Sequence, residues 1–155
     1  MDVEIVYFPA TKLAAIEHCG APALEYATLK KLIAWKLEMG YRDPAKYRSY
    51  GVHYTDPRST PASEHRVDFC LSVDEDVGAN AYGIINKRIP ALRCARARDL
   101  GSRSDNQAAP YLHKIWLPQS GEALGAFPMF FHYVNVGPHV PPHEMITDVY
   151  LPLSQ

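Results

Sequence analysis

The sequence lacks a long hydrophobic run, an excess of charge of one sign and a paired set of cysteines. No stretch of 18 apolar residues occurs, so we expect no membrane-spanning helix. Sixteen Lys and Arg residues balance seventeen Asp and Glu residues, which argues against a direct nucleic-acid binder. The N-terminal residues have neither the basic nor the apolar region of a signal peptide. The three cysteines lie far apart and form no C-x-x-C pair, which indicates a cytoplasmic protein.

The common sequence motifs of catalysis are also missing. The chain has no glycine-rich dinucleotide loop, no Walker loop, no G-x-S-x-G and no H-E-x-x-H. His139, His143 and Glu144 have a spacing that suggests a metal site on a helix, but three prolines between residues 138 and 142 prevent that helix. We therefore expect a solvated loop there. We also expect no metal and no cofactor, and we assign no catalytic residue.

An internal repeat is the first positive feature of the 155-residue chain. A shift of 81 positions aligns residues 9–40 with residues 90–121 without a gap. Seven aligned residues are then identical, among them the only two tryptophans, Trp35 and Trp116, whereas roughly two identities are expected by chance. Further along, the shift changes to 79 and then 80, as insertions in loops would produce. We predict two related halves, about residues 1–74 and 83–155, although coincidence stays an alternative.

Each half is predicted to contain a strand, a helix and two more strands. In the first half, a strand over residues 12–18 precedes a helix that begins near Pro22 and ends at Gly40. Strands over residues 50–55 and 66–73 follow, and the second of these alternates apolar and polar residues. In the second half, the corresponding segments are strands over residues 92–99, 129–135 and 145–151, with a helix from near Pro110 to near Trp116.

Additional strands over residues 3–8 and 83–89 precede the two halves. Eight strands and two helices predict an α+β domain, in which two pseudo-symmetric halves join their antiparallel sheets and carry both helices on one face. Such an arrangement leaves a concave seam between the halves, and seams of this kind commonly bind ligands.

A basic cluster begins at the second half of the chain. It consists of Lys87, Arg88, Arg93, Arg96, Arg98 and Arg103, with the single acid Asp99 among them. The cluster has no interleaved aromatic residues, which nucleic-acid binding favours. We therefore predict a charged sheet face or edge that discourages aggregation, and an acidic protein partner stays an alternative.

Aromatic residues at repeat-related positions indicate where a ligand binds. On the strand over residues 129–135, Phe131 and Tyr133 share one face, and Tyr54 has the matching place in the first half. With the two tryptophans, these residues could line an apolar pocket with tyrosine hydroxyls as polar contacts. A core without a cavity is the alternative. The predicted ligand-binding residues are Tyr54, Trp116, Phe131, Tyr133, Trp35 and Tyr82.

Several short segments, in one order along nearly the whole chain, also carry a family resemblance. They are Val3-Glu4-Ile5, Gly20, Tyr54-Thr55-Asp56-Pro57, Thr60-Pro61, Arg66-Val67-Asp68-Phe69-Cys70, Trp116-Leu117-Pro118-Gln119-Ser120-Gly121 and Pro128-Met129-Phe130-Phe131-His132-Tyr133-Val134-Asn135. In these segments the chain resembles GyrI-like small-molecule-binding proteins. That family includes effector-binding domains of AraC-type regulators and the stand-alone DNA gyrase inhibitory protein.

The resemblance implies a single GyrI-like domain over residues 1–155, with a duplicated strand–helix–strand–strand unit. Regulators of the family carry their helix-turn-helix outside this domain, so the resemblance implies a stand-alone binder of small aromatic or lipophilic molecules. Such a binder would act as a sensor or by sequestration, as in toxin resistance. Two alternatives stay open: a protein inhibitor with DNA gyrase as its partner, and a hydrolase of electrophilic toxins.

One residue departs from the family pattern. Members that bind cationic lipophilic drugs have a glutamate in the pattern Pro-x-Phe-Glu-x-Tyr, and Phe131 stands at that position. A buried cation without a counter-ion loses several kcal/mol to desolvation, while cation–π contact returns only about 0.5–2 kcal/mol. We therefore expect neutral or flat aromatic ligands, unless Phe131 simply fills the cavity. The missing acid also weakens the hydrolase alternative, because acid–base catalysis needs a titratable group.

Overall fold

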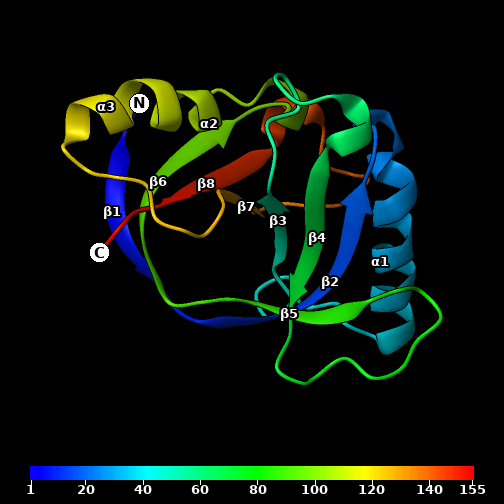
Figure 1. Ribbon diagram of the computed structural model, residues 1–155. Helices are drawn as coiled ribbons and strands as arrows, with labels where there is room; N and C mark the ends of the chain where they lie inside the picture. Colours follow the sequence, from blue (N-terminus) through cyan, green and yellow to red (C-terminus); the bar gives the residue numbers. More distant parts are fainter. The chain divides into compact units, whose positions relative to one another are not determined.

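The computed structural model describes all residues from 1 to 155 and divides them into two compact units (Figure 1). Residues 11–89 form the N-terminal unit, and residues 90–155 together with residues 1–10 form the C-terminal unit. Each unit combines antiparallel strands with a helical segment, so the predicted α+β class is confirmed. None of the helices is both long enough and apolar enough to cross a membrane.

The N-terminal unit contains four antiparallel strands in the order β3-β4-β2-β5. Strand β2 pairs with β4 and with the edge strand β5, and β4 also pairs with β3. The elements of this unit are β2 (Thr11–Cys19), the 3-10 turn η1 (Pro22–Leu24), α1 (Glu25–Met39), β3 (Ser49–His53), the 3-10 turn η2 (Ala62–Glu64), β4 (Arg66–Ser72) and β5 (Ile85–Ile89).

Helix α1 packs its apolar side onto one face of this sheet. Leu32 and Trp35, three residues apart and therefore on one side of the helix, are both buried. The helix ends at Gly40, which takes the left-handed conformation with φ 74°, as the sequence predicted for a C-terminal cap. Alternation along β2 and β4 supplies the opposing core residues, which are Ala14, Ile16, Val67, Phe69 and Leu71.

The C-terminal unit also contains four antiparallel strands, in the order β1-β6-β8-β7. Strand β6 pairs with β1 and β8, and β8 pairs with β7. Its elements are β1 (Val3–Phe8), β6 (Leu92–Leu100), the 3-10 turn η3 (Arg103–Asp105), α2 (Ala108–Tyr111), the π-helical turn η4 (Leu112–Trp116), α3 (Leu117–Ser120), β7 (Phe130–Tyr133), the 3-10 turn η5 (Pro142–Glu144) and β8 (Ile146–Pro152).

The helical segment of the C-terminal unit is longer and less regular than the sequence predicted. It begins at Ala108 and continues past Trp116 to Ser120, and Gly121 ends it with φ 76°. A wide π-helical turn interrupts the segment just before Pro118. Since proline has no N–H and its ring clashes with the carbonyl four residues earlier, the wider turn accommodates a residue that a continuous α-helix excludes.

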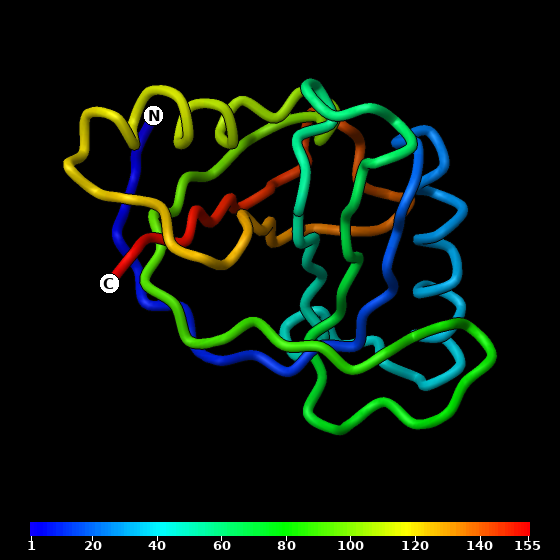
Figure 2. The backbone as a smooth tube through the Cα atoms, viewed as in Figure 1, coloured from blue at the N-terminus to red at the C-terminus, as the bar shows by residue number.

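Each sheet is completed by a strand from a distant part of the sequence. Strand β1 precedes β2 along the chain but pairs with β6, and the tube in Figure 2 shows it in blue beside the green β6. Strand β5 precedes β6 but pairs with β2. The two units thus repeat one strand order, β3-β4-β2-β5 and β7-β8-β6-β1. Their origin by duplication and their pseudo-symmetry stay predictions.

A glycine permits the C-terminal segment to pair beyond β8. Leu124 forms an isolated bridge with Leu153, and the Gly125 amide donates to the Pro152 carbonyl at 3.0 Å. A Cβ atom on Gly125 would lie 2.8 Å from the Leu153 carbonyl oxygen, which is closer than real Cβ contacts. This segment therefore requires a residue without a side chain.

We predict that Gly125→Ala lowers the free energy of unfolding by about 1–3 kcal/mol, because the added methyl group displaces a backbone bridge. Gly78→Ala is the matched control, since a Cβ atom on Gly78 meets nothing within 4 Å. Urea denaturation of the two variants measures the difference. Equal free energies of unfolding for Gly125→Ala and Gly78→Ala would contradict this prediction.

Candidate functional site

The six predicted ligand-binding residues are divided equally between the two units. Trp35, Tyr54 and Tyr82 belong to the N-terminal unit, whereas Trp116, Phe131 and Tyr133 belong to the C-terminal unit. The two sets have different surroundings, and only the second is brought together on one side of its sheet.

In the N-terminal unit, the sheet separates Tyr54 from Trp35. Trp35 is 4% exposed within the core beneath α1, and Tyr82 packs at the margin of the same core. Tyr54 follows β3 on the opposite face, where its hydroxyl donates to the Asp68 carboxylate at 2.7 Å. The Tyr54 hydroxyl is therefore already engaged, and Trp35 contributes to the packing of α1.

A charged group surrounds Tyr54. The Lys87 ammonium donates to Asp68 at 2.7 Å and to Glu17 at 2.9 Å, and the Arg66 guanidinium lies 4.7 Å from the centre of the Tyr54 ring. Burial and the adjacent Asp68 carboxylate raise the pKa of Tyr54 to about 12. Tyr54 thus stays a neutral hydrogen-bond donor throughout the physiological pH range.

In the C-terminal unit, Trp116 and Phe131 pack against one core beneath the helical segment. This core includes the buried residues Ala97, Leu112 and Val149. Phe131 lies opposite Val149 in the sheet, while the neighbouring Phe130 faces away and stacks on Tyr150 with ring centres 4.9 Å apart. Both candidate side chains are half-buried, and Trp116 is the last residue of the π-helical turn.

Tyr133 continues this aromatic group along β7. Its ring meets the edge of Phe131 with centres 6.3 Å apart, so the predicted common face of these two residues is confirmed. The Arg103 guanidinium lies 5.2 Å from the centre of the Tyr133 ring. Arg103 also donates to the Asn135 carbonyl at 2.7 Å, and burial lowers its pKa. A cation therefore already occupies one face of Tyr133.

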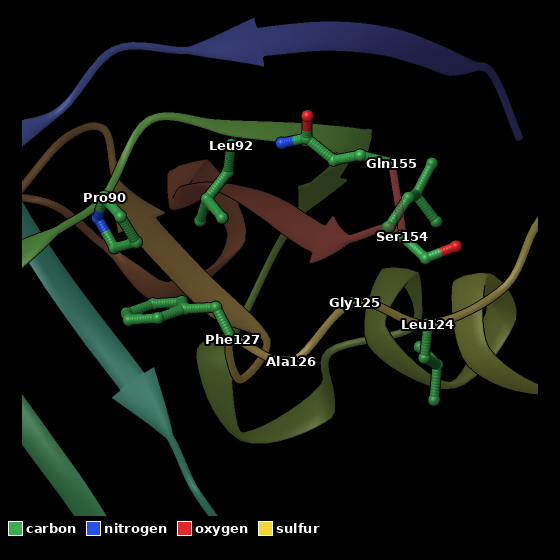
Figure 3. Close-up of a pocket in the computed structure, with 9 residues that line it drawn as sticks. Pro90, Leu92, Leu124, Gly125, Ala126, Phe127, Ser154 and Gln155 are labelled. Atoms are coloured by element: carbon green, nitrogen blue, oxygen red, sulfur yellow. The ribbon is translucent and has the colours of Figure 1, made fainter.

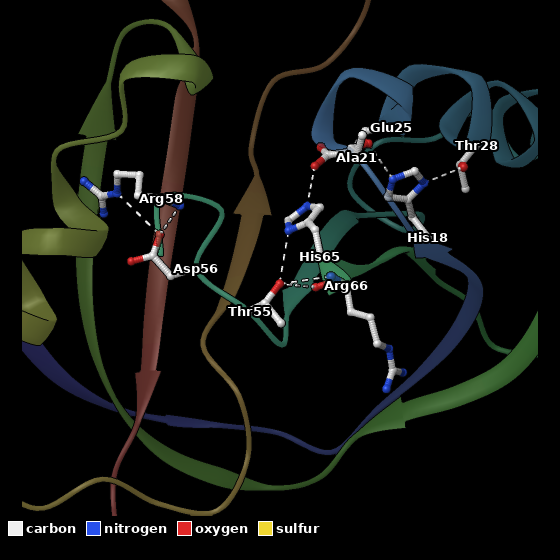
Figure 4. A network of polar contacts seen from close by, with 9 residues as sticks. All are labelled: His18, Ala21, Glu25, Thr28, Thr55, Asp56, Arg58, His65 and Arg66. Carbon is white, nitrogen blue, oxygen red and sulfur yellow. Dashed lines mark hydrogen bonds and ion pairs between the residues drawn. The ribbon is translucent and has the colours of Figure 1, made fainter. Parts of the chain in front are cut away.

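A histidine network that the sequence analysis missed holds the start of α1 (Figure 4). His65 lies between the Glu25 carboxylate at 2.7 Å and the Thr55 hydroxyl at 3.1 Å. His18 lies between the Thr28 hydroxyl at 2.7 Å and the Ala21 carbonyl at 3.0 Å. Glu25 and His65 are 40 residues apart, so no local motif connects them. The network secures the start of α1 to β2 and to His65, the residue that precedes β4.

A shallow apolar depression lies elsewhere in the C-terminal unit (Figure 3). Its volume is about 440 Å³, and none of the six predicted residues lines it. No charged side chain contributes to its wall, so it offers a ligand apolar contact surface but no ionic side-chain partner. The lining residues are Pro90, Leu92, Leu124, Gly125, Ala126, Phe127, Leu153, Ser154 and Gln155.

Most of the predicted basic cluster is neutralised by acids from other parts of the chain. The ion pairs are Lys87–Glu17, Lys87–Asp68, Arg93–Glu122, Arg96–Glu4 and Arg98–Asp148. Arg93 and Arg98 each donate to both oxygens of their carboxylates. These pairs agree with the predicted charged sheet surface. The structure contains no group of three His, Cys, Asp or Glu residues placed to hold a metal ion.

Burial and the nearby His65 lower the pKa of His53 to about 4, below its ordinary value of 6.5. The unfolded chain binds a proton at His53 more readily than the folded protein does. The contribution of neutral His53 to the free energy of unfolding is therefore fully present above pH 6.5, and it is lost as the pH falls towards 4. We predict that His53 contributes about 2 kcal/mol of the stability lost between pH 7 and pH 5.

His53→Gln should reduce this loss, whereas substitution of the exposed His143 by glutamine should leave it unchanged. Urea denaturation at the two pH values measures the loss in each variant. An identical loss in His53→Gln and in the unmodified protein would contradict the assignment.

Comparison with known proteins agrees with this architecture. The model of the GyrI-like small molecule binding domain family matches residues 1–154. A probable transcriptional regulator, YgiV of Escherichia coli (strain K12), is 34% identical over 99% of this chain and 97% of its own length. A DNA gyrase inhibitor of Erwinia billingiae (strain Eb661) is 27% identical over 100% of this chain and 99% of its own length.

Among solved structures, the EcmrR C-terminal domain is similar in fold, with a TM-score of 0.75 and 16% identity, over 99% of this chain and 98% of that domain. The family match covers nearly the whole sequence, and the resemblance predicted from short segments is confirmed. The chain therefore belongs to the family of GyrI-like small-molecule-binding domains.

Proposed function

We propose that this protein binds a flat, uncharged aromatic or lipophilic molecule at Trp116, Phe131 and Tyr133, as a sensor or by sequestration. The observation that carries the proposal is the half-buried aromatic group that these three residues form on one side of the C-terminal sheet. Family membership supports small-molecule binding as the general function. Aromatic side chains supply large apolar contact area, which favours a ligand with rings.

The charges around this group favour a neutral ligand over a cation. Phe131 provides no carboxylate, and Arg103 already places a positive charge over the Tyr133 ring. A buried organic cation would lose several kcal/mol of hydration, and its cation–π contact would return only about 0.5–2 kcal/mol. Repulsion by Arg103 adds to this deficit.

The helical segment over residues 108–120 covers the buried part of the aromatic group. Leu112 and Trp116 of this segment pack directly on the core that contains Phe131. The α-helical parts of the segment have four residues each and are separated by a π-helical turn. Such short helices depend on packing for their stability, and π-helical turns are frequent at functional sites. We therefore propose that this segment shifts when a ligand contacts the buried part of the aromatic group.

The three predicted residues of the N-terminal unit contribute less to the proposed site. Tyr54 offers its ring but not its hydroxyl, which donates to Asp68. Trp35 and Tyr82 pack in or beside the core beneath α1.

We also propose that the two units arose by duplication, since their strand orders and the sequence repeat agree. A cytoplasmic location is part of the proposal, and it is supported by three cysteines that are all free.

We predict that the neutral dye N-phenyl-1-naphthylamine binds more tightly than the cationic dye rhodamine 6G, as measured by fluorescence titration. Phe131→Glu should reverse this order, because it places a carboxylate within the aromatic group. The matched control is Phe127→Glu, which makes the same change in the apolar depression. If Phe127→Glu reverses the preference for the neutral dye and Phe131→Glu does not, the ligand binds in the apolar depression. Tight binding of rhodamine 6G that survives Phe131→Ala would refute the charge argument.

Inhibition of DNA gyrase is the second candidate function. It is favoured by the full-length similarity to a protein named DNA gyrase inhibitor. A supercoiling assay with purified gyrase separates the two candidates. Ligand binding alone predicts unchanged supercoiling at micromolar protein, whereas an inhibitor reduces supercoiling in proportion to its concentration without added ligand.

A further inference from the structure

A group of buried polar atoms without hydrogen-bonding partners lies in the C-terminal unit. The protein has five such side-chain atoms, and four of them belong to this unit. Buried polar atoms are normally paired, because burial without a partner costs free energy. The four atoms are Asp99 Oδ2, Arg103 Nε, Asn106 Nδ2 and Thr147 Oγ1.

Strand pairing and hydrogen bonds bring Asp99, Thr147 and Arg103 to one junction, where β6 ends and β8 begins. Asn106 adjoins this junction just before α2 starts. Asp99 and Thr147 are direct partners in the sheet. The other Asp99 oxygen accepts the Gln107 amide at 2.9 Å, and Asn106 is the preceding residue. Arg103 donates to the carbonyl of Ile146 at 3.2 Å, next to Thr147.

The junction adjoins the proposed ligand site. Tyr133 pairs with Thr147 on the other side of β8, and alternation places their side chains on the same face of the sheet as Asp99. The Arg103 guanidinium lies over the Tyr133 ring. A ligand against the Phe131 and Tyr133 rings therefore has the four polar side chains at one end.

The corresponding place in the N-terminal unit is fully paired. There, His18 of β2 has Val67 of β4 as its sheet partner. Both ring nitrogens of His18 have partners, the Thr28 hydroxyl and the Ala21 carbonyl. The shared strand order therefore does not force unpaired atoms at this junction. In the C-terminal unit, Asp99 and Thr147 stand at the two strand positions and each has an unpaired oxygen.

The junction carries one positive and one negative side chain without an ionic partner. Arg103 hydrogen-bonds two backbone carbonyls and the Asn135 amide oxygen, but no carboxylate. Asp99 accepts only the Gln107 amide. The two charges sum to zero, so a ligand group of either sign meets an unfavourable charge at one of them. An uncharged group with both a donor and an acceptor avoids this repulsion.

We propose that Asp99, Arg103, Asn106 and Thr147 bind the polar end of the ligand, and that this end is an uncharged amide-like group. Arg103 Nε and Asn106 Nδ2 donate to its carbonyl oxygen, Asp99 Oδ2 accepts its N–H, and the Thr147 hydroxyl serves either role. The inference rests on the proposed function, because Phe131 and Tyr133 receive the aromatic part of the same molecule.

Four naphthalene probes of similar size test the proposal at pH 7 by isothermal titration calorimetry. They are 2-naphthamide, 2-naphthoate, 2-naphthamidine and unsubstituted naphthalene. We expect 2-naphthamide to bind about tenfold more tightly than each of the others, through its paired donor and acceptor. Tightest binding of the anion or of the cation overturns the inference. Equal binding of 2-naphthamide and naphthalene also overturns it, since the polar atoms then serve water alone. Binding of none of the probes rejects the proposed function as well.

Two variants test whether Thr147 and Asp99 bind the polar group of the probe. Thr147→Val removes a hydroxyl that has no protein partner, so we expect an unchanged or higher melting temperature with a five- to tenfold weaker affinity for 2-naphthamide. Asp99→Asn keeps an oxygen for the Gln107 amide but removes the negative charge, so 2-naphthoate should become the tightest probe. Unchanged affinities in Thr147→Val would contradict the inference even if Asp99→Asn fails to fold.

Thr28→Val is the matched control in the N-terminal unit. Its hydroxyl is paired with His18, so the same chemical change should lower the melting temperature and leave the affinity for 2-naphthamide unchanged. A loss of 2-naphthamide affinity in Thr28→Val equal to that in Thr147→Val would show a general loss of packing and would overturn the assignment.

Discussion

A polar atom taken out of water needs a hydrogen-bonding partner, and the two units satisfy this constraint to different degrees. In the N-terminal unit, His18 and His65 are buried with both ring nitrogens paired, which secures α1 as one regular helix. In the C-terminal unit, the pairing at the equivalent junction is incomplete, and the helical segment above the sheet is broken by a π-helical turn. The same strand order thus supports a firmly attached helix in one unit and a less regular cover in the other.

The arginines of the C-terminal unit differ in their partners. Arg93, Arg96 and Arg98 are the three basic residues of β6, and each of them has a carboxylate partner within the fold. Arg103 is different, because it contacts carbonyls, an amide oxygen and the Tyr133 ring. The aromatic rings of Phe131 and Tyr133 therefore have a guanidinium beside them and, at position 131, a phenyl ring where a carboxylate could stand.

The sequence predicts local structure well where alternation or capping is strong. The end of α1 at Gly40 is found as expected. The apolar positions of β4 are buried as expected, but its polar positions after Arg66 are buried too, so the half-buried strand that alternation predicts was wrong because both faces of the sheet are covered there. The partners of β1 and β5 could not be read from the sequence, because strand pairing across many residues leaves no local pattern. The predicted site residues share an aromatic character but not a location, since periodicity tells which residues share a face and not which face binds a ligand. The histidine network joins residues too distant for any motif.

The edge strands β1 and β5 pair with partners that lie far away in the sequence, which fixes the order in which the sheets can form as the chain is synthesised. When the ribosome has released residues 11–72, the N-terminal sheet still lacks β5, and β2 has one open side until residues 85–89 emerge. Strand β1 is made first, yet its pairing surface on β6 emerges only with residues 92–100. The nascent chain therefore carries β1 unpaired until residues 92–100 have emerged, and the Ile5 and Tyr7 side chains are exposed even in the folded protein. Until β6 pairs with it, the open edge of β1 is free to pair with strands of other chains, which is a route to aggregation.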